Sequence, residues 1–307
     1  KTVTVLDRDG DRRFDQAYDK LILAPGAAPI VPPLDGVDST NIFTLRNVAD
    51  TDAIHDFLGS QQPKRAVVIG AGYIGLEMVE QLRERGIDVA LVELQDQVMP
   101  LLDPELAHIV ETEIRKHEVD VHLGRMAKSF VTQDGIASAV VLDDGTKLEA
   151  DLFILGIGVR PMTQLAEEAG LTLGETKGVL VDEFSRTSDP DIYAVGDACE
   201  YEFGPTGKRM RVALAGPANR AGRLAGQHAA TGESEAMAPV WGTSVVRVFG
   251  LTVALTGLSM KHAARLGLNH HCVGIRAAHH VGYYPGAEPM TLKLIFDPGD
   301  GKILGAE

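Results

Sequence analysis

The chain has little cysteine, few aromatic residues and no excess of positive charge, and each shortage narrows what it can be. Only two of its 307 residues are cysteines, Cys199 and Cys272, and they do not form a CxxC or similar close pair. Neither a disulfide framework nor a cysteine-rich metal site is therefore expected. We expect both cysteines to be small buried side chains in a protein of a reducing compartment, the cytoplasm.

Charge and hydropathy exclude two further classes of partner. The 29 basic and 43 acidic residues give a net charge of −14, which argues against nucleic acid or an anionic membrane surface as a partner. No apolar run approaches the ~18 residues needed to cross a bilayer, and the longest are strand-sized. The adjacent pairs His270-His271 and His279-His280 would point to opposite faces of a strand, so we predict no metal site.

What the chain does contain is a repeat. Residues 18–29 (YDKLILAPGAAP) recur in altered form at residues 150–161 (ADLFILGIGVRP). Each copy follows an Asp-Gly turn, so a hairpin leading into a buried apolar strand with a Gly/Pro stop is expected twice. The size of the offset indicates two related nucleotide-binding units. Only the second copy is preceded by a glycine fingerprint, and we expect the first to close a unit that begins upstream of Lys1.

The fingerprint is Gly70, Gly72 and Gly75, between a predicted strand (65–70) and a predicted amphipathic helix (73–85). In this context the first glycine permits a tight turn, the second lets the backbone approach a pyrophosphate, and the third lets the helix pack on the sheet. Glu93 ends the next predicted strand, roughly 20 residues on, where an acid hydrogen-bonds the ribose 2′-hydroxyl. A carboxylate there repels a 2′-phosphate, so NAD is favoured over NADP.

Other residues near the fingerprint leave two interpretations open. Glu77 is either a solvated helix glutamate or a side chain that faces the cofactor. Tyr73 is either a packing residue or an aromatic placed where a nicotinamide enters. Further along, Asp103-Pro104-Glu105 is typical of a helix start, with Asp103 as the N-cap.

A second signal lies in the segment TSDPDIYAVGDA, residues 187–198. A predicted strand (192–195) ends in Gly196, and Asp197 follows at once. This order places a carboxylate at the mouth of a sheet, where it can accept a hydrogen bond from a sugar hydroxyl.

Together these pieces resemble the flavin-dependent pyridine nucleotide-disulfide oxidoreductases. The matching residues are the glycine fingerprint with Tyr73-Ile74-Gly75-Leu76-Glu77, the two repeat motifs, and the segment from Ile192 to Asp197. The resemblance implies FAD and NAD as cofactors, with Tyr73 covering the nicotinamide side of the flavin. It further implies roles for four residues: Asp197 would hold the flavin's ribityl chain, Ala215 would offer a backbone N–H to the flavin ring, Gly158 would line the NAD site and Gly26 the FAD site.

The last part of the chain resembles one branch of this family in particular. Gly282-Tyr283-Tyr284-Pro285-Gly286-Ala287, followed by Met290 and Lys293, resembles the dimer-interface domain of coenzyme A-disulfide reductases, NADH oxidases and persulfide reductases. The resemblance implies a homodimer in which Tyr283 reaches the partner's active site; the other interpretation is a core or turn tyrosine. The redox cysteine of this branch has no counterpart here and is expected upstream of Lys1.

We therefore predict an α/β protein with two Rossmann-like domains and an α+β dimer-interface domain, truncated at both ends. The expected parts are an FAD segment (1–47), an NAD domain (48–163), a second FAD segment (164–236) and the interface domain (237–307). The predicted activity passes a hydride from NADH through FAD to a coenzyme A disulfide, persulfide or polysulfide. The alternatives are an NADH oxidase or peroxidase and, in a different class, a nucleotide-binding sensor without turnover.

Overall fold

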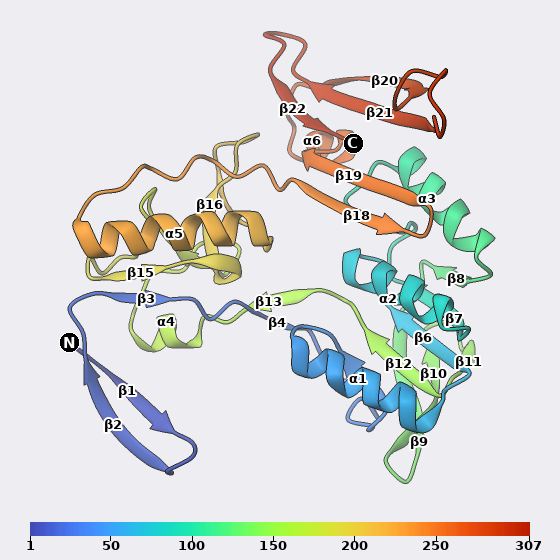
Figure 1. Cartoon of the computed structure of the whole chain (residues 1–307), viewed down its shortest axis with the longest axis horizontal. Helices are drawn as coiled ribbons and strands as arrows, with labels where there is room; N and C mark the ends of the chain where they lie inside the picture. The colour runs from blue at the N-terminus through green and yellow to red at the C-terminus, as the bar shows by residue number, and fades with distance from the viewer. The chain divides into compact units, whose positions relative to one another are not determined.

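The computed structural model describes residues 1–307 and divides them into two compact units (Figure 1). One unit consists of residues 1–27 and 160–242, the other of residues 28–159 and 243–307. Each is therefore built from two separate stretches of chain. No helix is both long enough and apolar enough to cross a membrane.

A five-stranded parallel sheet forms the centre of the second unit. Its strands, in spatial order, are β5 (Ile42–Thr44), β12 (Leu152–Leu155), β6 (Arg65–Ile69), β7 (Asp88–Glu93) and β8 (Asp120–Leu123). All four residues of β12 and the last four of β6 are buried. Such unbroken apolar runs are expected where a parallel sheet is covered on both faces.

The two faces of this sheet have different cover. Val68 and Ile154 lie in one core with three helices, α1 (Val48–Gln61), α2 (Tyr73–Glu84) and α3 (Pro104–Lys116). Val67 and Phe153, one residue earlier on the same strands, lie in a second core. That core is shared with an antiparallel sheet, β9 (Ala127–Gln133), β10 (Ile136–Leu142) and β11 (Lys147–Glu149). Neighbouring residues of one strand lie in different cores because successive side chains point to opposite faces of the sheet.

A five-stranded antiparallel sheet completes this unit. Its strands, in order, are β18 (Ser244–Val248), β19 (Leu251–Gly257), β22 (Ile303–Ala306), β21 (Pro289–Phe296) and β20 (His271–Ala278), with helix α6 (Met260–Arg265) between β19 and β20 along the chain. Val246 and Val248 of β18 are buried in the same core as α2 and α3. The antiparallel sheet and the parallel sheet therefore belong to one unit.

The two compact units group the chain differently from the four parts predicted from the sequence. The segment predicted as the interface domain shares a core with the predicted NAD domain. Strand β5, which lies inside the predicted FAD segment 1–47, pairs in parallel with β12 and so belongs to the same sheet as the glycine loop. The sequence pattern did not predict β5 as a strand of this sheet, because β5 is only three residues long.

The first unit contains the other copy of the repeat. Strand β3 (Leu21–Leu23) pairs in parallel with β15 (Ile192–Ala194), and helix α5 (Ala215–Thr231) packs against both. The remaining elements lie around this pair or at the unit boundary: hairpin β1 (Thr2–Asp7) and β2 (Arg12–Ala17), β4 (Ala27–Pro29), β13 (Val159–Pro161), α4 (Gln164–Glu168), β14 (Val179–Leu180), the 3₁₀ turn η1 (Gly196–Ala198), β16 (Cys199–Glu202) and β17 (Arg209–Arg211).

The repeat itself is confirmed as two equivalent strand ends, with one difference. β3 is followed by Gly26 at φ 71°, and β12 is followed by Gly158 at φ 110°. Both conformations favour glycine. All four residues of β12 are buried, as predicted, whereas Ile22 of β3 is 40% exposed.

Candidate dinucleotide-binding sites

The glycine loop lies at the point where the order of strands in the parallel sheet reverses. The chain runs from β6 to β7 to β8 in one direction, whereas β12 lies on the other side of β6. The Gly70 N–H donates to the Val92 carbonyl and the Gly156 N–H donates to the Ile69 carbonyl, each at 2.7 Å. Gly70 and Gly156 thus flank the reversal at the carboxyl ends of the strands, which is where ligands bind in open α/β sheets.

The three fingerprint glycines are required for different reasons. A Cβ on Gly70 would lie 2.4 Å from the Gly156 carbonyl oxygen, and a Cβ on Gly75 would lie 1.9 Å from the Gly70 carbonyl oxygen. Both glycines are therefore demanded by the packing of the protein itself. A Cβ on Gly72 would meet no atom within 4 Å. Nothing in the chain requires Gly72 to lack a side chain, so the open space there fits a ligand that approaches the backbone closely.

The start of α2 is left open to an anion. Gly72 is its N-cap and Tyr73 its first residue; no side chain caps this end, and the first turn contains no acid. By contrast, α1 starts with a complete capping box between Asn47 and Asp50. The free N–H groups and the helix dipole at α2 favour a negatively charged group. Ile74 packs against the neighbouring core and anchors this turn.

Glu93 lies at the carboxyl end of β7 and is 8% exposed. Its Oε2 accepts from the Ala71 N–H at 2.7 Å, and its Oε1 accepts from the Gln95 N–H at 2.8 Å. The carboxylate thus ties the glycine loop to the end of the neighbouring strand. Glu77, on the same helix as Tyr73, is exposed and makes no hydrogen bond or ion pair with the protein.

Gly158 belongs to the same edge of the sheet. It follows β12, and its carbonyl accepts from the Ile30 N–H at 3.0 Å. With φ at 110°, the residue adopts a backbone conformation that side chains disfavour. The structure therefore brings Gly70, Gly72, Glu93 and Gly158 to one edge of the sheet.

A second cluster forms in the other unit, where β3 and β15 end. Gly196 has φ 82°, its N–H donates to the Tyr201 hydroxyl at 2.8 Å, and a Cβ there would lie 3.8 Å from the Ala218 Cβ in the first turn of α5. Asp197 follows in η1 and is half-buried. Ala215, the first residue of α5, is exposed at a helix start that no side chain caps. Gly196, Asp197 and this helix end therefore lie together.

Tyr283 is an exposed residue of the unit that contains the glycine loop. It is 84% exposed in the loop between β20 and β21, where its ring lies beside that of Tyr284 with centroids 5.4 Å apart. The exposure of Tyr283 is that of a turn residue and not of a core residue.

The two cysteines are free thiols. Cys199 is buried on β16, and its burial raises the pKa of the thiol to about 12. The expectation of a buried structural cysteine is confirmed at this position. Cys272 is partly buried on β20.

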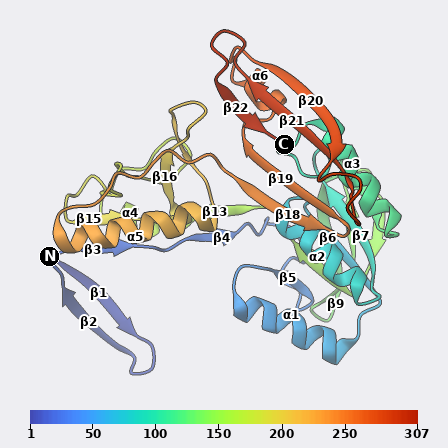
Figure 2. The ribbon, with the colours of Figure 1, turned by 45° about the horizontal axis from the view of Figure 1, so that its top comes forward.

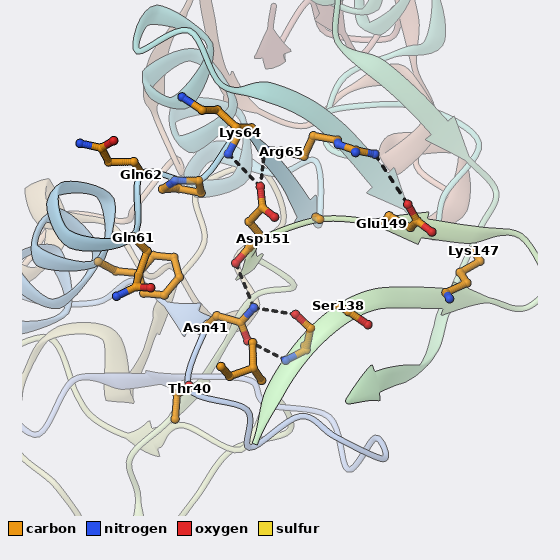
Figure 3. A pocket seen from close by; sticks show the side chains of 15 residues that line it. Thr40, Asn41, Gln61, Gln62, Lys64, Arg65, Ser138, Lys147, Glu149 and Asp151 are labelled. Atoms are coloured by element: carbon orange, nitrogen blue, oxygen red, sulfur yellow. Dashed lines mark hydrogen bonds and ion pairs between the residues drawn. The ribbon is translucent and has the colours of Figure 1, made fainter. Parts of the chain in front are cut away.

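A cavity of about 770 Å³ opens at the opposite edge of the parallel sheet, beside the amino ends of β6 and β12 (Figure 3). Its polar groups bond to one another: Asn41 donates to the Ala137 and Asp151 carbonyls, and the Asp151 carboxylate accepts from the backbone N–H groups of Lys64 and Arg65. Asn41 and Asp151 thus hold strands in place. The glycine loop is at the other end of β6, so this cavity is no part of the candidate sites.

Sequence reasoning missed two contacts of helix α2. The buried Glu80 accepts from Arg247 Nε at 2.9 Å and from the Phe249 N–H at 2.6 Å. The Tyr73 hydroxyl forms a 2.6 Å hydrogen bond with the Ser244 hydroxyl. The only sequence signal for Glu80 was an acid on the apolar side of the helix.

Comparison with known proteins agrees with this geometry. The family model described as pyridine nucleotide-disulphide oxidoreductase matches residues 1–222. An NADH oxidase of Methanocaldococcus jannaschii is 35% identical over 99% of this chain and 67% of its own length. Among solved structures, reduced CoADR-RHD of Bacillus anthracis matches at 43% identity with a TM-score of 0.96, and a NAD-dependent persulfide reductase of A. fulgidus at 35% with 0.95.

Both structural matches cover the whole of this chain, which spans 55% and 56% of those two chains. The fold, the glycine loop at the sheet's switch point and the extent of the family match lead to one identification. The chain belongs to the pyridine nucleotide-disulphide oxidoreductase family.

Proposed function

We propose that this chain forms the nucleotide-binding and flavin-binding part of an enzyme that oxidises NADH and reduces a small disulfide or persulfide. The observation that carries the proposal is the open space at Gly72, between two glycines that the packing requires. A loop of this kind, at a strand-order reversal and in front of an uncapped helix, fits a pyrophosphate. The acid at the end of the next strand fits a ribose.

Each residue of the nucleotide site has a distinct proposed role. The backbone of residues 70–75 holds the pyrophosphate, Glu93 accepts from the adenosine ribose and favours NADH over NADPH, and Gly158 lets the chain pass close to the nucleotide. Ile74 holds the helix start in place. Tyr73 borders the nicotinamide end, and the exposed Glu77 is the remaining proposed cofactor contact on α2.

The second cluster fits the flavin. Asp197 can accept from a ribityl hydroxyl, the free N–H at Ala215 can donate to a ring carbonyl, and Gly26 and Gly196 let the backbone approach closely. When bound, the FAD supplies two-electron transfer between a nicotinamide and a disulfide. NADH, a proton and the disulfide then give NAD⁺ and two thiols, or a thiol and hydrogen sulfide from a persulfide.

The electron acceptor is proposed from chemistry and from the named relatives. The matched structures carry the names CoADR-RHD and persulfide reductase, which favour a sulfur acceptor. The NADH oxidase name of the curated relative keeps oxygen as the second candidate. The Cys199 thiol is not the attacking group, because a thiol of pKa about 12 stays protonated at neutral pH.

A second copy of this chain is the proposed partner, with the cytoplasm as the proposed compartment. β20 is an edge strand, and apolar side chains of β20, β21 and their connection are largely exposed: Val273 50%, Ile275 53%, Val281 51%, Met290 44% and Leu292 37%. Such a face fits an interface between copies, to which Tyr283 would contribute. Ile275→Glu should shift the mass measured by light scattering from dimer to monomer.

Anaerobic titration of the flavin-loaded, full-length protein tests the activity. NADH should bleach the flavin absorbance, and a coenzyme A disulfide or polysulfide should restore it. Reoxidation far faster by oxygen or peroxide than by any disulfide would select the oxidase alternative. Nucleotide binding without any bleaching would select the sensor without turnover.

A further inference from the structure

Strand β18 holds helix α2 at two points. The Tyr73 hydroxyl bonds to the Ser244 hydroxyl at 2.6 Å, and Glu80 binds Arg247 and the Phe249 N–H. In both views of the chain β18 lies beside α2 (Figures 1 and 2), and the two elements pack together.

The two contacts, Tyr73–Ser244 and Glu80–Arg247, are spaced equally along the helix and along the strand. Tyr73 and Glu80 lie about 10 Å apart along the helix at ~1.5 Å per residue. Ser244 and Arg247 lie about 10 Å apart along the strand at ~3.3 Å per residue. Between the two contacts Val246 is buried in the core of α2. The strand therefore holds the helix over two turns. The Tyr73–Ser244 hydrogen bond acts on the first residue of the helix.

That residue is adjacent to the proposed pyrophosphate site. Tyr73 follows Gly72, and the helix start at Gly72 has no side-chain cap of its own. Burial raises the pKa of the Tyr73 hydroxyl, although the bond to Ser244 counters it. The hydroxyl consequently stays neutral and keeps its bond to Ser244 across the working pH range. The position of the Tyr73 ring is thus set by a residue far along the chain.

We propose that Ser244 is a positioning residue of the dinucleotide site, which acts by holding Tyr73 and with it the first turn of α2. The inference rests on the proposed nucleotide function. Loss of the Ser244 hydroxyl leaves the ring with its packing against the core but without the bond that fixes its hydroxyl end. The nucleotide must then order that end on binding, which costs affinity.

A double-mutant cycle on NADH binding tests this role. The dissociation constant is measured by nucleotide fluorescence for the purified wild-type protein, Ser244→Ala, Tyr73→Phe and the double variant. Each single substitution should raise the constant about three- to tenfold, the range produced by one lost hydrogen bond. The double variant should be no weaker than the weaker single variant, because both substitutions break the same bond.

Thr243→Val is the matched control. Thr243 precedes Ser244, and its hydroxyl bonds to the Thr256 hydroxyl at 2.7 Å on the neighbouring strand. The control removes a hydroxyl–hydroxyl bond directly beside Ser244 and should leave the NADH constant unchanged. Equal binding by Ser244→Ala and wild type, or additive effects in the double variant, would overturn the positioning role. A wild-type protein that does not bind NADH would instead overturn the proposed function.

Discussion

The carboxylate of Glu93 accepts a hydrogen bond of 2.7 Å from the backbone N–H of Ala71, inside the glycine loop. The acid proposed to bind the ribose therefore also holds the loop proposed to bind the pyrophosphate. The two proposed roles are physically joined, because one buried side chain serves both.

Glu93→Ala should weaken NADH binding more than NADPH binding. The substitution removes the ribose acceptor and leaves the N–H groups of Ala71 and Gln95 without a partner, which costs about 1–3 kcal/mol of stability. Dissociation constants for both nucleotides and a thermal melt measure the two effects. Glu149→Gln, at an exposed ion pair with Arg65, is the control. An unchanged ratio of the two constants would refute the specificity assignment.

Gly75→Ala should lose stability, whereas Gly72→Ala should lose NADH binding. Alanine at 75 places its Cβ 1.9 Å from a backbone oxygen, so it should destabilise the fold by at least about 1–3 kcal/mol. Alanine at 72 meets no protein atom within 4 Å at φ −81°. It should therefore leave the melting temperature nearly unchanged and weaken NADH binding more than tenfold. Parallel melts and titrations separate the two, and tight binding by Gly72→Ala would contradict a pyrophosphate at that position.

Cys199 should resist alkylation in the folded protein. Its burial raises the pKa of the thiol to about 12, and only the thiolate reacts at a useful rate. Mass spectrometry after N-ethylmaleimide treatment at neutral pH should show Cys199 unmodified, and denaturant should make it reactive. Fast labelling of native Cys199 would contradict its structural role.

Local patterns predicted the glycine loop and the strands around it, because their requirements lie within a few neighbouring residues. Gly70, Gly72 and Gly75 act within one turn, so their spacing carries the signal. The pairing of Glu80 with Arg247 could not be predicted, since the two are 167 residues apart and nothing in either neighbourhood names the other.

Asp103 shows how a long-range contact can override a local pattern. Asp103 is the N-cap residue of α3, as the sequence predicted, but its side chain makes no bond to that helix. The fully buried carboxylate instead accepts from the N–H groups of Met260 and Lys261 at the start of α6 and pairs with Lys293 at 2.6 Å. The buried ammonium group of Lys293 binds the carboxylate more strongly than a backbone N–H of α3 would. Lys293 lies on β21, far from Asp103 along the chain, so the residues around Asp103 do not reveal this contact.

Glu307, next to Asp103, should make stability fall as the pH rises from about 5 to 8. Burial, reinforced by the Asp103 charge, raises the pKa of Glu307 to about 7, above the ordinary value of 4.5. The folded state therefore holds a proton that the unfolded state has already lost in this window. The contribution is fully present below the unfolded pKa and is lost as the pH rises through the folded pKa.

Glu307→Gln should remove this component of the pH dependence. The amide oxygen can still accept from the Asp103 N–H, which Glu307 Oε1 binds at 2.9 Å, and the second oxygen has no partner to lose. Denaturant titrations at pH 5 and pH 8 measure the difference, with Glu149→Gln as the exposed control. The variant should lose less stability than the wild type between the two pH values. An identical loss in both proteins would show that Glu307 does not titrate in this range.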